Sequence, residues 1–165
     1  MKQDLPLPIN IANLNKRFAL DLSALSCIAR QILRYLGRRR YSLEVVFVGN
    51  DAIRRLNRSF TGRDTSTDVL SFDLRRTESG REPLCGCICI SSDKALTNSR
   101  IFGTGFDREL VLYIIHGVLH LVGYDDTLKD DARRMHAREE KVLAYLSRRG
   151  VLSNVRSRSK AQVTV

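Results

Sequence analysis

The sequence predicts an α/β (α+β) domain in which a single sheet of about four strands is covered by about five helices. Apolar residues recur at helical spacing in several segments, and short strand-like runs lie between these segments. A length of 165 residues with 43% hydrophobic residues suits one core rather than two. We therefore expect one domain over residues 1–150, followed by a basic, disordered tail at residues 151–165.

Four short runs bounded by polar or turn-forming residues are expected to form the strands. The first run, PINIANLN, is the weakest of the four. The runs SLEVVFVG and TDVLSFDL are rich in β-branched and aromatic side chains, and CGCICIS alternates cysteines with glycine or isoleucine. In chain order these strands are expected at residues 8–15, 42–49, 67–74 and 85–91.

Five helices are predicted from apolar residues spaced three and four positions apart. The first is regularly amphipathic and ends at Gly37, and the second begins after Asn50. A short third helix precedes the fourth, which is long, apolar and closed by Gly123. The fifth has an apolar stripe that includes Met135. In chain order these helices are expected at residues 22–36, 51–60, 93–103, 106–123 and 129–146.

The formal net charge of +10 is large for this length, and no acidic residue follows Glu140. Such an excess suits a polyanionic partner such as nucleic acid, although a solubilising surface has the same composition. The first residues lack the apolar core of a secretory signal, and no segment is apolar enough to span a bilayer. We expect a cytoplasmic protein without a membrane partner, whose four cysteines are thiols.

The run HGVLHLVGYDD carries the clearest chemical signal, because it places metal-binding residues on the long fourth helix and the turn after it. His116 and His120 are one helical turn apart, so their imidazoles point the same way. Catalytic zinc normally has three protein ligands. Gly123 permits a reversal that returns Asp126 to the ion, and Asp125 is the alternative third ligand. We therefore expect one Zn²⁺, or another divalent ion, in each chain.

The same spacing also fits a zincin-like metalloprotease, in which the two histidines are followed by a glycine and a third ligand. Those proteases place a glutamate directly after the first histidine as the general base. This chain has Gly117 there, which has no side chain to move a proton. A second alternative makes His116 and His120 ordinary core histidines, but the clustering of ligand types favours a metal site.

The run HGVLHLVGYDD resembles the HGxLHLxGYDH signature of the YbeY family, metal-dependent endoribonucleases that mature ribosomal RNA. LNRSFTGRDTSTDVLSFD (56–73) is similar to the family's second motif, and GCICIS (86–91) to its GDIxIS strand. The resemblance extends over residues 42–147. It implies a single-strand-specific endoribonuclease that acts in maturation of the 16S rRNA 3′ end and in ribosome biogenesis. Its implied partners are rRNA and the ribosome or small subunit.

The resemblance also implies site residues. His116 and His120 match the first two metal ligands of the family, and Asp126 stands at the position of the third histidine. A carboxylate there leaves metal binding possible, because zinc accepts carboxylate oxygen. However, an anionic ligand lowers the net charge at the ion and should weaken its acidification of bound water.

A second departure lies in the basic loop of the family, where Thr61 replaces an arginine thought to contact RNA or the reacting phosphate. Arg58 and Arg63 are the candidate RNA-binding residues that supply this charge, and Arg63 is the candidate catalytic arginine. Because Gly117 cannot act as a base, Asp125 is the candidate catalytic residue for proton transfer, with metal-bound hydroxide itself as the alternative. The departures at Thr61 and Asp126 also keep open a non-catalytic, metal-containing RNA- or ribosome-binding factor.

Other polar residues have less specific signals. Asp68 and Ser71 either line the cleft beside the ion or form strand-edge hydrogen bonds. His136 is expected at the surface of the last helix or beside the metal ligands, where it is a substitute for one of the three ligands. Glu139 lies in the apolar stripe of that helix, where we expect a backbone or arginine partner.

Three cysteines alternate along the run CGCICIS. Cys85, Cys87 and Cys89 should therefore share one face of a strand. Such a group could form a soft metal site, but residues two apart on a strand are poorly placed around one tetrahedral ion, and small thiols pack well in cores. We expect these thiols to contribute to packing. Cys87 also stands where the YbeY family usually has an aspartate.

Overall fold

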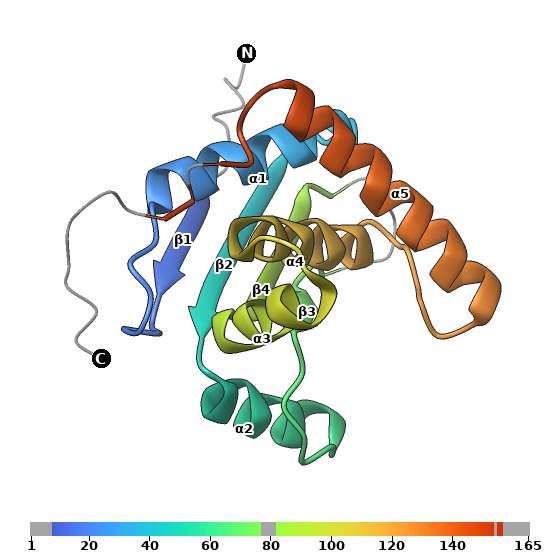
Figure 1. Cartoon of the computed structure of the whole chain (residues 1–165). Helices are drawn as coiled ribbons and strands as arrows, with labels where there is room; N and C mark the ends of the chain where they lie inside the picture. The colour runs from blue at the N-terminus through green and yellow to red at the C-terminus, as the bar shows by residue number, and fades with distance from the viewer. Residues whose placement is uncertain (1–7, 77–81, 154, 157–165) are drawn as a thin grey trace.

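The strands of the computed structural model are β1 (Ile9–Asn13), β2 (Tyr41–Val48), β3 (Val69–Asp73) and β4 (Leu84–Ser91). They form one sheet in the order β1-β2-β4-β3, in which β1, β2 and β4 are parallel and β3 is antiparallel to β4 (Figure 1). The structure describes residues 8–76, 82–153, 155 and 156. Each expected strand is present, including the weakest, which is β1.

The helices are α1 (Leu22–Tyr35), α2 (Asn50–Thr61), α3 (Ser92–Phe102), α4 (Phe106–Leu121) and α5 (Lys129–Arg148). Each corresponds to one of the expected helices, with ends that differ by at most two residues. Asp21 begins α1 by accepting a hydrogen bond from the Ala24 backbone N–H at 2.9 Å. The α/β (α+β) class with one four-stranded sheet and five helices is therefore confirmed over the described residues.

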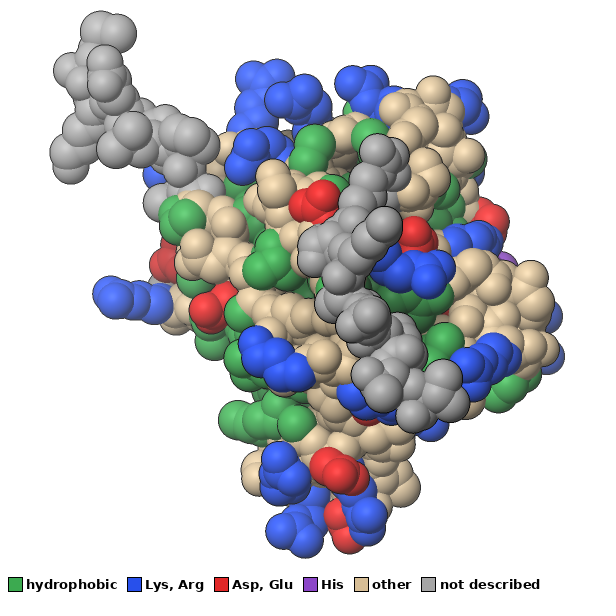
Figure 2. Space-filling model, turned by 60° about the vertical axis from the view of Figure 1, so that its left-hand side comes forward, with side chains coloured by type: hydrophobic (Ala, Val, Ile, Leu, Met, Phe, Trp, Pro, Cys, Tyr) green, Lys and Arg blue, Asp and Glu red, His purple; other side chains and the backbone are tan. Residues whose placement is uncertain are grey.

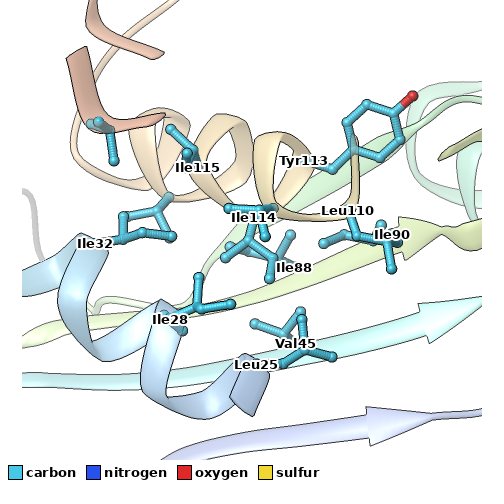
Figure 3. Close-up of a cluster of buried hydrophobic side chains, with 14 of the residues drawn as sticks. Leu25, Ile28, Ile32, Val45, Ile88, Ile90, Leu110, Tyr113, Ile114 and Ile115 are labelled. Carbon is cyan, nitrogen blue, oxygen red and sulfur yellow. The ribbon is translucent and has the colours of Figure 1, made fainter. Parts of the chain in front are cut away.

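The core lies between the sheet and the helices on one of its faces. On β2, Leu43, Val45 and Phe47 are buried, and the intervening Glu44 is exposed, as alternation along a strand requires. Helices α1 and α4 cross the sheet, and α5 packs on both (Figure 1). Figure 3 shows side chains from α1, the sheet and α4 meeting at the centre of this layer, among them Ile28, Ile32, Val45, Ile88 and Ile114.

Helix α4 approaches β4 closely at Gly117. A Cβ atom at this position would lie 2.6 Å from Cγ2 and 2.9 Å from Cδ1 of Ile88, and 3.1 Å from the Ser71 hydroxyl oxygen. Only a glycine fits such contacts without a shift of the neighbouring side chains. Gly117 therefore fixes how deeply α4 sits on the sheet. His116 and His120 remain partly exposed on the same helix, with side-chain exposures of 24% and 29%.

The folded region extends beyond the expected boundary at residue 150. Val155 is fully buried, and its carbonyl oxygen accepts a hydrogen bond from the Asp21 backbone N–H at 2.8 Å. Arg156 forms a β-bridge with Leu20. The expected disorder is wrong for Val155 and Arg156, because burial of one apolar side chain and these backbone contacts hold them near the start of α1. The rest of the expected tail after Arg156 lies outside the described residues.

None of the helices that the structure describes has the length and hydropathy needed to cross a membrane.

Candidate metal centre

Helix α4 brings the two histidine rings together, one turn apart. The Nε2 atoms of His116 and His120 lie 3.1 Å apart, and the rings meet edge to face at an interplanar angle of 84°. The Oδ2 atom of Asp126 lies 3.6 Å from Nε2 of His116 and 3.9 Å from Nε2 of His120. The three expected ligands thus converge, although Asp126 comes from the loop after the helix.

The turn that returns Asp126 depends on Gly123. Its φ of +102° lies in a region that residues with a Cβ atom rarely adopt. The same turn places the Tyr124 carbonyl oxygen 3.1 Å from Nδ1 of His120. When Nδ1 carries the hydrogen and donates a hydrogen bond to this carbonyl oxygen, the Nε2 lone pair is free to bind a metal.

Glu139 of α5 orients the other histidine. Its Oε1 atom lies 2.7 Å from Nδ1 of His116, and the glutamate is buried. Burial lowers the pKa of His116, but the hydrogen bond that its ring donates to Glu139 and the charges of Glu139, Asp68 and Asp126 outweigh this effect, so the pKa is raised overall. The expected backbone or arginine partner of Glu139 is therefore wrong. Its partner is His116, and Oε2 lies 3.4 Å from Nδ1 of His136.

The donor set fits a divalent ion such as zinc. Two Zn–N bonds of about 2.05 Å at a tetrahedral angle separate their nitrogens by about 3.3 Å, close to the separations found here. Over the part of the chain that the structure describes, His116, His120 and Asp126 are the one group of three or more His, Cys, Asp and Glu side chains positioned to share an ion. The side chain of Asp126 is 48% exposed, which leaves one side of the centre open to solvent.

Asp125 has a different local role from Asp126. Its Oδ1 atom accepts hydrogen bonds from the backbone N–H groups of Asp126 and Thr127 and from the Thr127 hydroxyl. The Thr127 hydroxyl contributes most, and together these bonds lower the pKa of Asp125. A carboxylate with a lowered pKa is a weaker proton acceptor. Asp125 is not one of the three grouped donors, and its expected catalytic role remains a prediction.

Arg58 lies in the last turn of α2 and Arg63 in the loop after it; Figure 1 shows this helix at a distance from α4. Both residues are exposed, and no ion pair or side-chain hydrogen bond among the described residues places them against the histidines. Thr61 donates its hydroxyl hydrogen to Asn57, whose side-chain oxygen is 2.7 Å away and whose backbone oxygen is 2.8 Å away. The Thr61 side chain therefore hydrogen-bonds within the last turn of α2 and, unlike the arginine of the family, presents no positive charge to RNA.

Asp68 and Ser71 take separate positions near the centre. The Ser71 hydroxyl donates a hydrogen bond to the Gly117 carbonyl oxygen at 3.2 Å, which joins β3 to α4. Asp68 lines a cavity that His116 also lines. Asp68 is therefore part of the wall of this cavity, whereas Ser71 holds α4 against the sheet through its hydrogen bond.

Cys85, Cys87 and Cys89 are free thiols on β4. They alternate with Gly86 and Ile88, which contact α4, so the thiols lie on the opposite face of the sheet. A hydrogen bond with Cys89 raises the pKa of Cys87, and the same bond lowers that of Cys89.

The contact between Glu139 and His116 gives a testable consequence. Glu139→Gln retains the shape of the side chain but removes its charge, so we expect metal affinity to fall by about 10- to 100-fold. Competition with a fluorescent zinc chelator measures the change. Glu44→Gln, at an exposed position on β2, is the matched control and should retain full affinity. Equal affinities of the two variants would contradict the role of Glu139.

Comparisons with known proteins agree with this fold and identify a family. The family model "Endoribonuclease YbeY" matches residues 10–147. An endoribonuclease YbeY of Geobacter metallireducens is 34% identical over 150 residues, which cover 88% of this chain and 100% of the relative. One from Chlorobaculum tepidum is 36% identical over 140 residues, with 85% and 98% covered. A solution structure of a Thermotoga maritima protein superposes with a TM-score of 0.58 at 25% identity, covering 94% of this chain and all of that one. The chain therefore belongs to the endoribonuclease YbeY family.

Proposed function

We propose that the chain is a metal-dependent, single-strand-specific endoribonuclease that acts in maturation of the 16S rRNA 3′ end and in ribosome biogenesis, in the cytoplasm. Family membership makes it an RNA-cleaving hydrolase with a role in rRNA processing. The observation that supports the metal dependence is the convergence of His116, His120 and Asp126. Zinc is the proposed ion, because two imidazoles and a carboxylate suit it, although other divalent ions bind similar donors.

The ion, the two histidines and Asp126 have separate roles in the proposed reaction. A bound divalent ion supplies Lewis acidity for hydrolysis of a phosphodiester. His116 and His120 present their Nε2 atoms because Glu139 and the Tyr124 carbonyl oxygen hold the opposite ring nitrogens. Asp126, at the exposed side, adds a negative charge that makes the centre less electrophilic than one with three imidazoles.

The surface charge supports an RNA substrate. The chain has a net charge of +10, and Figure 2 shows Lys and Arg side chains spread over the visible face, with fewer Asp and Glu side chains between them. Arg58 and Arg63 are exposed beside the loop that leads from α2 to β3. We propose that these two arginines bind the RNA backbone, and that rRNA within the ribosome or its small subunit is the natural partner.

Removal and return of the metal test this function. Chelator-treated protein should lose cleavage of single-stranded RNA, and added Zn²⁺ should restore it. Casein serves as a second substrate. Cleavage of RNA that persists without metal would contradict the proposal. Turnover of casein with intact RNA would indicate a metalloprotease, and tight RNA binding without cleavage under several divalent ions would indicate a binding factor.

Asp126→His tests the third ligand. Because imidazole in place of carboxylate restores the donor set of the family signature, we expect higher metal occupancy and faster RNA cleavage. Elemental analysis and initial rates measure both effects. Asp125→His, one residue earlier, is the control and should raise neither. Unchanged occupancy and rate in Asp126→His would show that Asp126 is not a ligand.

A further inference from the structure

A cavity of about 490 Å³ extends from the metal centre along α4, between α3 and α5. Its volume lies in the range of about 300–1,000 Å³ that small-molecule sites occupy. His116 lines it at the metal end, and Asp68, Phe102 and Tyr113 are also part of its wall. The cavity thus adjoins the place where the proposed function puts a phosphodiester.

The charge of the wall decides which part of a nucleotide can enter. Four carboxylates line the cavity, those of Asp68, Glu109, Glu139 and Glu140. They outnumber the one arginine of the wall, Arg108, which is ion-paired with Glu109 and Glu140, and the two imidazoles of His116 and His136. A phosphate would be repelled by these carboxylates, because like charges at short distance disfavour each other. A nucleobase carries no charge and presents hydrogen-bond donors and acceptors at its edge. The electrostatics therefore favour a base inside the cavity and the backbone outside it.

Two polar groups in the wall suit the edge of a base. Asn98 donates a hydrogen bond to the Tyr113 hydroxyl oxygen at 2.7 Å, so the hydroxyl hydrogen is available to another acceptor. Burial, followed by the charge of Asp68, raises the pKa of Tyr113 and keeps this hydrogen in place. Asp68 accepts hydrogen bonds through Oδ1 from Thr67 and Val69, and no hydrogen bond among the described residues uses its Oδ2. Tyr113 and Asp68 therefore offer one donor and one acceptor to the edge of a base.

An exposed aromatic ring completes the arrangement. Phe102 lies at the C-terminal end of α3, is 67% exposed and still lines the cavity. Bases stack on aromatic rings in a largely sequence-independent way. The preceding residue, Ile101, is exposed to the same 67% but is not part of the wall. The two neighbours differ in their relation to the cavity and not in their burial.

We propose that this cavity is a subsite for an unpaired nucleobase of the RNA strand, stacked on Phe102 and hydrogen-bonded at its edge by Asp68 and Tyr113. The inference rests on the proposed function. It adds a physical reason for restriction to single strands, because a paired base is stacked in its helix and its Watson–Crick edge is already occupied. A duplex therefore cannot fill the cavity without losing a base pair.

Binding to the full chain after chelator treatment tests the subsite without relying on cleavage. The probe is a short fluorescein-labelled single-stranded RNA, and a duplex of the same sequence is the reference. Phe102→Ala should weaken binding of the single strand by about 5- to 150-fold and bring it close to that of the duplex. Ile101→Ala should change neither affinity. Equal effects of the two substitutions would overturn the subsite, and both variants should fold because both side chains are exposed.

A second variant tests the edge contact. Asp68→Asn replaces an acceptor by an amide that can also donate, so the order of affinities among oligonucleotides that differ in one base should change. An unchanged order would overturn the role of Asp68. These binding results are independent of the metal experiment. Chelator-insensitive RNA cleavage with Phe102-dependent binding would refute the proposed metal dependence alone, and chelator-sensitive cleavage without Phe102-dependent binding would refute the subsite alone.

Discussion

His120→Ala is expected to lose the bound metal and to reduce RNA cleavage by more than about 100-fold, which exceeds the usual effect of changing a residue behind a ligand. The substitution removes the Nε2 atom that lies 3.1 Å from that of His116. One imidazole and a partly exposed carboxylate then remain, and this is too few donors for tight binding of zinc. Elemental analysis of the purified protein and the initial rate of RNA cleavage measure the two losses.

His136→Ala is the control for this experiment. His136 is the third histidine of the chain, its side chain is 72% exposed on α5, and it lies outside the group of three donors. We expect this variant to retain the metal. If it loses the metal and His120→Ala does not, His136 is the substitute ligand and the present assignment is wrong.

Gly117→Glu should prevent folding, although it creates the sequence that a zinc protease has at this position. The new Cβ atom alone would lie 2.6 Å from Ile88, and overpacking of this kind costs about 1–3 kcal/mol. A carboxylate held against apolar side chains without a partner adds a penalty of about several kcal/mol. Because small domains have a total stability of about 5–15 kcal/mol, we expect little folded protein. Circular dichroism during urea unfolding measures the loss.

Two further glycine variants separate packing from charge. Gly117→Ser introduces the same close Cβ contact without a charge and should lower the stability by about 1–3 kcal/mol. Gly105→Ser is the matched control, since Gly105 has no neighbouring atom within 4 Å and precedes α4 at a position that favours serine. If both serine variants are equally stable, the contact with Ile88 does not restrict residue 117.

The protease hypothesis weakens further on this account. At residue 117 the helix faces β4, whereas His116 and His120 face the opening. Close packing against the sheet requires glycine at residue 117. This position therefore has no room for the glutamate that a zinc protease uses as its general base.

The sequence predicts the local parts of the centre well because they depend on short-range geometry. His116 and His120 converge because helical residues four apart share a face, and Asp126 returns because Gly123 allows the reversal. The contact between Glu139 and His116 spans 23 residues and depends on how α5 packs on α4. No local pattern specifies that packing, although a carboxylate within an apolar stripe is a signal that a buried partner exists.

The same limit applies to Val155 and to the two arginines, whose RNA-binding role stays a prediction. Val155 is one apolar residue in a basic, polar segment, so it has no periodicity that would predict its burial. Arg58 and Arg63 are placed by the end of α2 and the loop after it, and sequence position alone does not determine their distance from the histidines. Packing between distant segments decides each of these cases.

The hydrogen bond between Glu139 and His116 also determines when, during translation, the metal centre is complete. Helix α5 is the last helix of the described chain, so its glutamate leaves the ribosome after both histidines. Domains acquire tertiary contacts as their segments emerge. A nascent chain that ends within the first turns of α5 has the two imidazoles but not the carboxylate that orients one of them. The centre is therefore complete only after Glu139 has emerged, and we expect chains that end before this residue to bind a metal ion more weakly than chains that contain it.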